Sequence, residues 1–281
     1  MRALLKLLPS LLLGLAWVSA HAAGERPLTL GVVPYLSARA IVQLYRPLQE
    51  QLERALQRPV RLVTAPDYIT FLDKTAKREY DLVATSPAFG RLAQLETGYV
   101  PLARPVHSLE VLLVTPRDGP LQSLEALRGQ IIATTDLLAT LTLAGQRALR
   151  ERGLVPGRDV TLRATSSHAN SLAALQRGDA AAAISSATAL RQLSQSTVAE
   201  VRIVTVLSTT TPLLYLASPA LAPPEVETVR RTMLEFANAT EAGRRFVDEL
   251  GHGGLAPIVP RDMASLDPLV GDLKAQLENM R

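Results

Sequence analysis

Short apolar runs alternate with helical patterns along most of this chain, and that alternation restricts the fold more than any other feature of the sequence. The helical pattern is clearest after Ser37, where Ile41, Tyr45, Leu48 and Leu52 recur at helical spacing. Alternation of this kind is typical of an α/β protein with mainly parallel sheets. We expect strands at residues 28–33, 60–64, 82–85, 110–115, 130–134, 160–164, 181–185, 201–206 and 213–217.

Two polar breaks divide the chain into an outer part and a middle part. The first break reads PRDGP at 116–120 and the second reads STTTP at 208–212. They predict one lobe built from residues 24–115 together with 213–281, and a second lobe, 116–212, inserted into the first. Two strands joining the lobes would form a hinge beside a mobile cleft. We therefore expect a monomer rather than a dimer.

The first residues have the pattern of a secretory signal peptide. Arg2 and Lys6 precede an apolar run, which ends in the small-residue pattern Ala20-His21-Ala22. The run contains Pro9 and is short for a membrane span, so a membrane anchor is the weaker interpretation. With no cysteine in the chain, neither a lipid-bearing cysteine nor a disulfide can form. The prediction is a signal peptide at residues 1–23 and a soluble periplasmic protein after its cleavage.

Composition and motifs argue against several classes of function. The chain is 47% hydrophobic and 20% charged, which indicates a globular protein. Its net charge is only +4, without a block of Lys and Arg, so nucleic acid is not an expected partner. No metal-binding or cofactor motif occurs, and Ser86 does not lie in a G-x-S-x-G elbow. We expect no cofactor, no metal and no enzymatic activity.

Polar residues recur where the expected strands pass into helices. In an α/β sheet, ligands collect beyond the carboxyl ends of the parallel strands, where helix N-termini offer free backbone N–H groups. The alternative is structural, because Ser, Thr and Asp cap helices and tyrosines pack in cores. Five such junctions on two segments favour a ligand site that combines hydroxyls, amides and helix dipoles around an oxyanion. The candidate ligand-binding residues are Tyr35, Ser37, Tyr68, Ser86, Thr134, Thr135, Asp136 and His168.

Asp136 has two possible roles that the sequence leaves open. Its carboxylate could cap a helix at residues 137–150, which would leave Thr134 and Thr135 free for a ligand. In the other role it lies against the ligand, where an ionised carboxylate only accepts hydrogen bonds and repels a dianion. Among the histidines, His168 follows a strand and could donate to an anion or act as a helix cap. His252 lies in a GHGG turn and is expected to be exposed.

The order and spacing of several segments resemble the phosphonate-, phosphite- and phosphate-type periplasmic substrate-binding proteins of ABC transporters. The resemblance is carried by LTLGVVPYLSARAIVQLYRPLQEQLERAL, by VRLVTAPDYITFL, by YDLVATSPAFGRLA and by SSHANSLAALQRGDAAAAIS, which together cover most of the expected mature chain. This family implies a type II binding-protein fold with two α/β lobes that close on the ligand. By position, Tyr35, Tyr68 and Ser86 would contact the ligand from the first lobe. The second lobe would contribute Thr134, Thr135, Asp136 and His168.

The chain departs from the family pattern at three positions. The Ser/Thr-Ser-Gly run expected after the fifth strand reads TDLLAT at residues 135–140 and lacks the glycine. A tyrosine common in the third helix is Phe89, and an acidic residue that can hold an amino group is Ser185 or Ser186. These changes disfavour an aminophosphonate ligand.

The sequence thus predicts a solute-binding protein of an ABC importer, which carries a phosphate-, phosphite- or phosphonate-like anion to a membrane permease. The alternative is a sensory module that uses the same two lobes to signal to a membrane kinase or cyclase. Neighbouring genes would separate the two, because a permease and an ATPase indicate transport.

Overall fold

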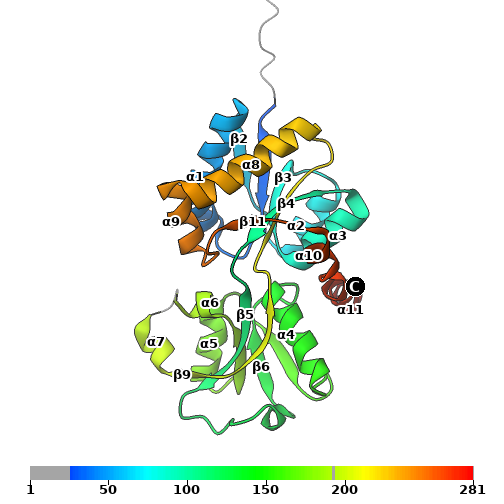
Figure 1. The fold of residues 1–281 in the computed structure, drawn as a ribbon. Coiled ribbons are helices and arrows are strands. Elements are labelled where there is room, and N and C mark those ends of the chain that lie inside the picture. Colours follow the sequence, from blue (N-terminus) through cyan, green and yellow to red (C-terminus); the bar gives the residue numbers. More distant parts are fainter. Residues whose placement is uncertain (1–25, 192–193, 281) are drawn as a thin grey trace, which may run out of the picture.

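Strands form two separate sheets in the computed structural model, which describes residues 26–191 and 194–280 (Figure 1). The predicted signal peptide at 1–23 lies outside the described residues. The strands are β1 Leu28–Val32, β2 Val60–Val63, β3 Leu82–Thr85, β4 Val100–Pro105, β5 Leu109–Pro116, β6 Ile131–Thr134, β7 Thr161–Ala164, β8 Ala182–Ser185, β9 Val201–Thr210, β10 Leu214–Ala217 and β11 Leu255–Pro257.

Helices cover both sheets. They are α1 Ala38–Leu56, α2 Tyr68–Ala76, α3 Pro87–Thr97, α4 Thr140–Glu151, α5 His168–Gln176, α6 Ala187–Arg191, α7 Gln195–Ala199, α8 Pro223–Ala239, α9 Glu241–Glu249, α10 Pro260–Ala264 and α11 Asp267–Asn279, with a 3₁₀ turn at Glu125–Leu127. Within the described ranges, none of these helices is both long and apolar enough to cross a membrane.

Each sheet is mixed and has the same plan. In the first lobe the strand order is β11-β4-β10-β3-β1-β2, with β1 parallel to β2 and β3, and β10 antiparallel to β3. In the second lobe the order is β7-β6-β8-β5-β9, with β6 parallel to β7 and β8, and β5 antiparallel to β8. The α/β class is confirmed, and in each lobe an antiparallel strand joins a block of three parallel strands.

Alternating side chains bury both faces of the second sheet. Leu112 and Val114 of β5 point to a core under α5, whereas Val111 and Leu113 belong to the larger core that continues into the first lobe. In the first lobe, α1, α8 and α9 lie on one side of the sheet, and α2, α3 and α11 on the other (Figure 1). Helices on both faces explain why the inner parallel strands β1, β3 and β8 are buried along their whole length.

Helix α1 forms as its sequence pattern predicts. Ser37 is its N-cap and accepts a hydrogen bond from the Ala40 N–H at 3.3 Å. Ile41, Tyr45 and Leu48 are fully buried beneath the helix, together with Leu52. The cap and the apolar stripe together fix where the helix begins and which face it buries.

The chain crosses between the sheets twice, at 106–108 and at 211–213. Residues 109–115, which we assigned to the outer lobe, lie in β5 and pair with β9 in the second sheet. The predicted break STTTP continues β9 as far as Thr210. Threonine is β-branched and suits an edge strand such as β9, so its polarity did not mark the end of the strand.

The GHGG turn packs against the first crossing. The His107 N–H donates to the carbonyl of His252 at 2.9 Å, and the Val106 N–H donates to that of Gly254. The His107 ring lies so close to Gly253 that a Cβ there would come within 2.2 Å of it. His252 is only 3% exposed, so the expectation of an exposed histidine was wrong. Its burial, with the charge of His107, lowers the pKa of His252 to about 3.

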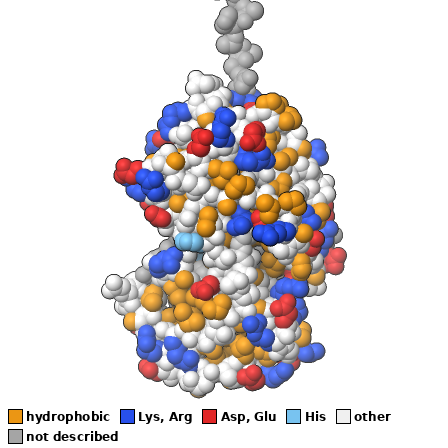
Figure 2. Space-filling view, in the orientation of Figure 1, with side chains coloured by type: hydrophobic (Ala, Val, Ile, Leu, Met, Phe, Trp, Pro, Cys, Tyr) orange, Lys and Arg blue, Asp and Glu red, His pale blue; other side chains and the backbone are white. Residues whose placement is uncertain are grey.

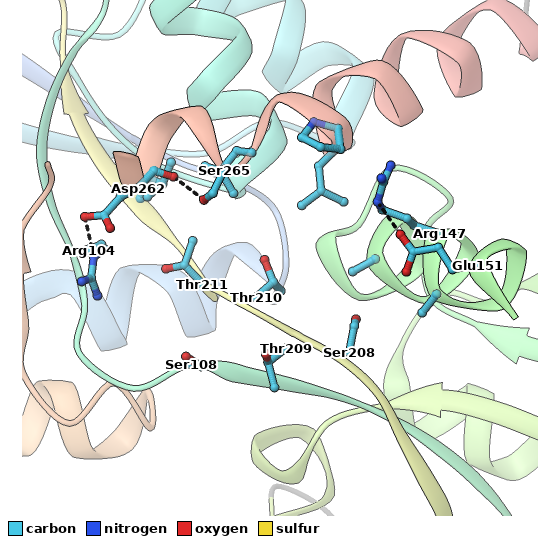
Figure 3. Close-up of a pocket in the computed structure, with 16 residues that line it drawn as sticks. Arg104, Ser108, Arg147, Glu151, Ser208, Thr209, Thr210, Thr211, Asp262 and Ser265 are labelled. Carbon is cyan, nitrogen blue, oxygen red and sulfur yellow. Dashed lines mark hydrogen bonds and ion pairs between the residues drawn. The ribbon is translucent and has the colours of Figure 1, made fainter. Parts of the chain in front are cut away.

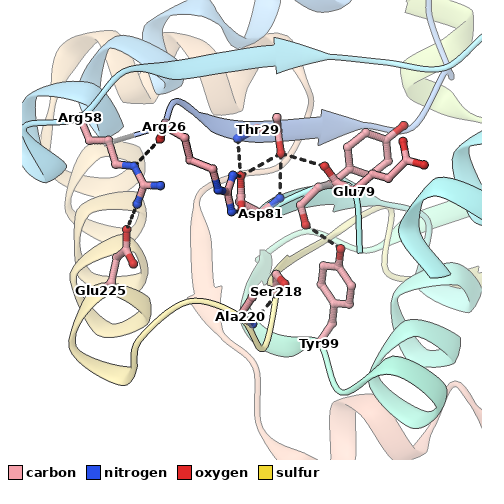
Figure 4. Close-up of polar contacts among 10 residues, drawn as sticks. Arg26, Thr29, Arg58, Glu79, Asp81, Tyr99, Ser218, Ala220 and Glu225 are labelled. Carbon is pink, nitrogen blue, oxygen red and sulfur yellow. Dashed lines mark hydrogen bonds and ion pairs between the residues drawn. The ribbon is translucent and has the colours of Figure 1, made fainter. Parts of the chain in front are cut away.

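An ion pair joins the start of the first sheet (Figure 4). The guanidinium of Arg26 donates to both carboxylate oxygens of Asp81, at 2.8 and 2.6 Å. Thr29, on β1, donates to the same carboxylate through its N–H and its hydroxyl, at 2.8 and 3.0 Å. Burial alone would raise the pKa of Asp81, but the hydrogen bonds from Arg26 and Thr29 outweigh it and hold the pKa below its ordinary value.

We predict that Asp81→Asn lowers the free energy of unfolding near pH 7 by roughly 1–3 kcal/mol, because it leaves buried donors poorly matched. A group with a depressed pKa stabilises the fold above its ordinary pKa, near 3.9, and loses that effect as the pH falls through the folded pKa. The difference between wild type and variant, measured by urea denaturation, should therefore shrink below about pH 4. The control is Asp73→Asn, an exposed partner of Lys77, which should change stability by less than about 0.5 kcal/mol. Equal losses in both variants would contradict this account.

Candidate functional site

Strand register brings the carboxyl ends of the parallel strands to the edges where the two lobes meet. β10 starts directly after the second crossing, and its first residue, Leu214, pairs with Thr85 at the end of β3. β5 starts directly after the first crossing, and Leu112 pairs with Ser185 at the end of β8. The parallel neighbours of β3 and β8 end at the same two edges. The junctions singled out in the sequence therefore face each other across the crossings.

Buried hydroxyls without partners stand at equivalent positions of both sheets. Thr85 ends β3 and is 0% exposed, Ser86 follows it and is 3% exposed, and Ser185 ends β8 and is 1% exposed. Among the described residues, none of these hydroxyls has a hydrogen-bond partner. Ser86 even occupies the N-cap position of α3 without capping it. Unpaired buried polar groups cost stability, so these three hydroxyls have donor capacity that the described residues leave unused.

Tyr68 in the first lobe lies close enough to Asp136 in the second lobe for the charge of Asp136 to act on it. Tyr68 is the first residue of α2, and its ring packs edge-on against Phe89 at 6.0 Å between centroids. Burial raises the pKa of the Tyr68 hydroxyl, and the charge of Asp136 in the opposite lobe raises it further. Tyr68 is therefore a neutral hydrogen-bond donor.

Tyr35 lies in the loop between β1 and α1. Its side chain is half-buried, and its hydroxyl is 3.2 Å from that of Tyr45 on α1. Burial raises the pKa of Tyr35 above its ordinary value. It too stays neutral at physiological pH.

His168 is the first residue of α5, with Ser167 as the N-cap of the helix. The ring nitrogen Nδ1 is buried and has no partner among the described residues. Burial lowers the pKa of His168, so the imidazole is neutral near pH 7. A neutral ring at a helix N-terminus can donate one hydrogen bond without adding a charge.

Besides Tyr35, three of the predicted residues have structural partners. Ser37 is exposed and caps α1. The Thr134 hydroxyl is fully buried and 2.6 Å from that of Thr142 on α4. Asp136 accepts a hydrogen bond from the Leu138 N–H at 2.8 Å, while Thr135 beside it is half-buried.

The predicted helix at 137–150 begins later than expected. Its first residue is Thr140, and its N-cap is Ala139, which offers no side-chain cap. The Asp136 carboxylate instead binds the turn before the helix, because a short acidic side chain readily accepts from a backbone N–H two residues on.

Sequence reasoning did not include Thr85 and Ser185 among the candidate ligand residues. Ser185 was noted only as the position where the family has an acidic residue. Its neighbour Ser186 accepts from the Ala189 N–H at 3.1 Å and is thereby occupied. A usable signal was present in the sequence, since β3 ends in a Thr-Ser pair and β8 in a Ser-Ser pair, whose second residue lies just after the strand at matching points of the two sheets.

The site has little charge of its own. None of the eight predicted residues is cationic, and Asp136 is the one acid among them. Figure 2 shows positive and negative side chains interspersed over the face in view, without a large region of one sign. Within residues 26–191 and 194–280, no group of three or more His, Asp and Glu side chains is placed to hold a metal ion. Anion recognition here would therefore depend on neutral hydrogen-bond donors.

A separate cavity of about 490 Å³ lies beside the second crossing (Figure 3). It is lined by α4, the end of β9, α10 and the start of α11, and contains none of the eight predicted residues. Arg104 in its wall pairs with Asp262, and Arg147 pairs with Glu151. Because these arginines already have carboxylate partners, the cavity does not present free positive charge to an anion.

Residues 30–263 match a family profile described as the periplasmic substrate-binding protein of a phosphonate ABC transporter. This match spans both lobes and both crossings. The chain belongs to this family. No curated protein matches it significantly by sequence.

Solved structures of similar fold agree with membership of the phosphonate-binding family. XAC2383 from Xanthomonas citri, bound to ATP, has a TM-score of 0.76 at 18% identity, covering 90% of this chain and 99% of its own. PhnD1 from Prochlorococcus marinus, in complex with methylphosphonate, scores 0.75 at 12% identity, covering 88% and 98%. The aliphatic sulphonate binding protein SsuA from Escherichia coli scores 0.61 at 18%, covering 90% and 87%. The predicted type II binding-protein fold is thus confirmed.

We predict that Ser86→Ala weakens binding of methylphosphonate by this family member about tenfold or more, because a hydrogen bond to a charged group is lost. The melting temperature should not fall, since the Ser86 hydroxyl has no partner in the protein. Calorimetric titration and thermal denaturation would measure the two effects. Thr240→Ala is the control: it removes the cap of α9, Glu241–Glu249, and should cost roughly 0.5–2 kcal/mol of stability while leaving affinity unchanged. A Ser86→Ala protein with full affinity and reduced stability would contradict the assignment.

Proposed function

We propose that this periplasmic substrate-binding protein captures a small oxyanion of phosphate, phosphite or phosphonate type for an ABC importer. The observation that carries the proposal is the set of buried, unpartnered hydroxyls at facing strand ends, Thr85 and Ser86 in one lobe and Ser185 in the other. Family membership supports transport, and PhnD1, a protein of similar fold, was crystallised with methylphosphonate.

Neutral donors would bind the anion as the lobes close. Hydroxyls of serine and tyrosine, the neutral imidazole of His168 and the free N–H groups at the start of α3 each donate without a full positive charge. Closure excludes water, which strengthens each of these hydrogen bonds. The protein would release the ligand unchanged to a permease and act as a monomer, without chemistry at the site.

A panel of ligands tests this function through thermal stability. A ligand that binds only the folded protein at about 100 times its dissociation constant adds roughly 2.7 kcal/mol of stability. For a protein of this size we expect methylphosphonate, phosphite or phosphate to raise the melting temperature by roughly 5–10 °C. Methanesulfonate and acetate serve as anions of similar size and different chemistry. A shift with either of them and none with the phosphorus oxyanions would contradict the proposed ligand class.

Asp136 should set which protonation state of the ligand is bound. One carboxylate oxygen is held by the Leu138 N–H, and the charge acts on Tyr68 across the cleft. A monoanion that keeps a proton can donate to this carboxylate, whereas a dianion is repelled.

We predict that Asp136→Asn keeps the fold, because asparagine can accept from the same N–H group. The variant should bind phosphate about three- to tenfold more tightly than wild type near pH 8, where the dianion prevails, and about equally near pH 5.5. Titration of affinity between these pH values measures the effect. Parallel curves for the two proteins would show that Asp136 only holds the turn before α4.

A further inference from the structure

Four of the six tyrosines of the chain, all in the first lobe, act on one another electrostatically. Tyr35 and Tyr68 are the predicted ligand contacts, and Tyr45 and Tyr215 lie behind them, on α1 and β10. The Tyr35 hydroxyl acts electrostatically on both Tyr68 and Tyr215. The hydroxyl groups therefore form one cluster, although their residues come from four different elements.

Tyr45 is the innermost member of this cluster that has a defined hydrogen bond. Its side chain is 0% exposed, and its ring packs edge-on against Phe246 at 5.4 Å between centroids. The hydroxyl lies 3.2 Å from that of Tyr35. A buried phenol needs a partner for its O–H, and a phenylalanine would fill the same space without that need. The hydroxyl of Tyr45 thus has a polar role toward Tyr35 that packing does not explain.

Tyr215 on β10 interacts electrostatically with both Tyr45 and Tyr35. It is 1% exposed and pairs with Ala84, next to Thr85 at the end of β3. Its hydroxyl meets no partner at full hydrogen-bond geometry in the described part of the chain, but it is near enough to Tyr45 for each to influence the pKa of the other. Burial raises the pKa of all three phenols, so Tyr35, Tyr45 and Tyr215 are neutral.

Proton counting gives the hydrogen bond between Tyr35 and Tyr45 a direction. Each neutral phenol has one proton to donate. If Tyr35 donates its proton to an oxyanion in the cleft, its oxygen can only accept from Tyr45. The charge of the anion favours this direction, because successive hydrogen bonds polarise and strengthen one another.

We propose that Tyr45 is a positioning residue, which donates to the Tyr35 hydroxyl and so aims the Tyr35 O–H at the anionic ligand. The proposal rests on the proposed function, since it requires that Tyr35 contacts an oxyanion. Tyr45 touches no ligand itself and acts only through Tyr35. It gives the first lobe a donor of fixed direction at a place where the chain has no cationic side chain among the predicted contacts.

The test is a double-mutant cycle with methylphosphonate as the probe. Tyr45→Phe keeps the ring and its contact with Phe246 and removes only the hydroxyl. Affinity should fall roughly three- to tenfold. In a Tyr35→Phe background the same change should have no further effect, because the group that it orients is absent.

Tyr99→Phe is the matched control. Tyr99 is 1% exposed in the same lobe and donates to the carbonyl of Tyr80 at 2.6 Å, away from the clustered tyrosines. This variant should lower the melting temperature and leave affinity unchanged. It separates a general effect of losing a buried phenol from the effect on ligand binding.

Each outcome has a distinct meaning. Full affinity in Tyr45→Phe, or independent and additive losses in the two variants, would overturn the role of Tyr45 while leaving the proposed function intact. A wild-type protein that binds no phosphorus oxyanion would contradict the proposed function, and the role of Tyr45 with it. The proposal is supported if Tyr45→Phe weakens binding in the wild-type background and has no effect in the Tyr35→Phe background.

Discussion

The pairing of β5 with β9 is the interaction on which the arrangement of the candidate site depends. β5 is the first strand of the second lobe in chain order and β9 is the last. They pair from Leu109 with Thr210 to Pro116 with Val201. Because they lie side by side, the two crossings at 106–108 and 211–213 also lie side by side. The antiparallel neighbours then orient β3 and β8, so that Thr85 and Ser185 end at the two facing edges. We propose that these two adjacent crossings act as the hinge between the lobes.

Much of this architecture could be predicted from the sequence, and the misses have physical reasons. The β-branched and apolar runs located nine strands, because residues of these types favour the extended backbone and pack well on the surface of a sheet. β4, Val100–Pro105, was missed because Pro101 and Pro105 argue against a strand, and β11 has only three residues after a glycine-rich turn. Hydroxyls at the strand ends identified the region of the site. Their partners could not be predicted: nothing in the sequence shows that Thr142 engages Thr134, or that Ser86 leaves its helix uncapped.

The candidate site contains buried polar groups that lower the stability of the protein and are available to bind a ligand. Unpaired hydroxyls at Thr85, Ser86 and Ser185, and the unpaired nitrogen of His168, each destabilise the protein to some degree. Neutral tyrosines and a neutral histidine add no charge to the site, so Asp136 is the one charged side chain among the eight predicted residues. An oxyanion would accept hydrogen bonds from several of these groups at once. Because the donors are already held in place, little entropy would be lost in ordering them on binding. The cavity beside the second crossing differs from this site, because its arginines are already paired with carboxylates of the protein.

Amide hydrogen exchange with and without methylphosphonate tests the location of the site most directly. If the ligand lies between facing strand ends, protection should increase together at 86–90 after β3 and at 135–139 and 186–189 after β6 and β8. The lining of the separate cavity, at 208–211 and 262–269, should change less. Protection confined to one lobe, or strongest around that cavity, would contradict the account of a two-lobed oxyanion site.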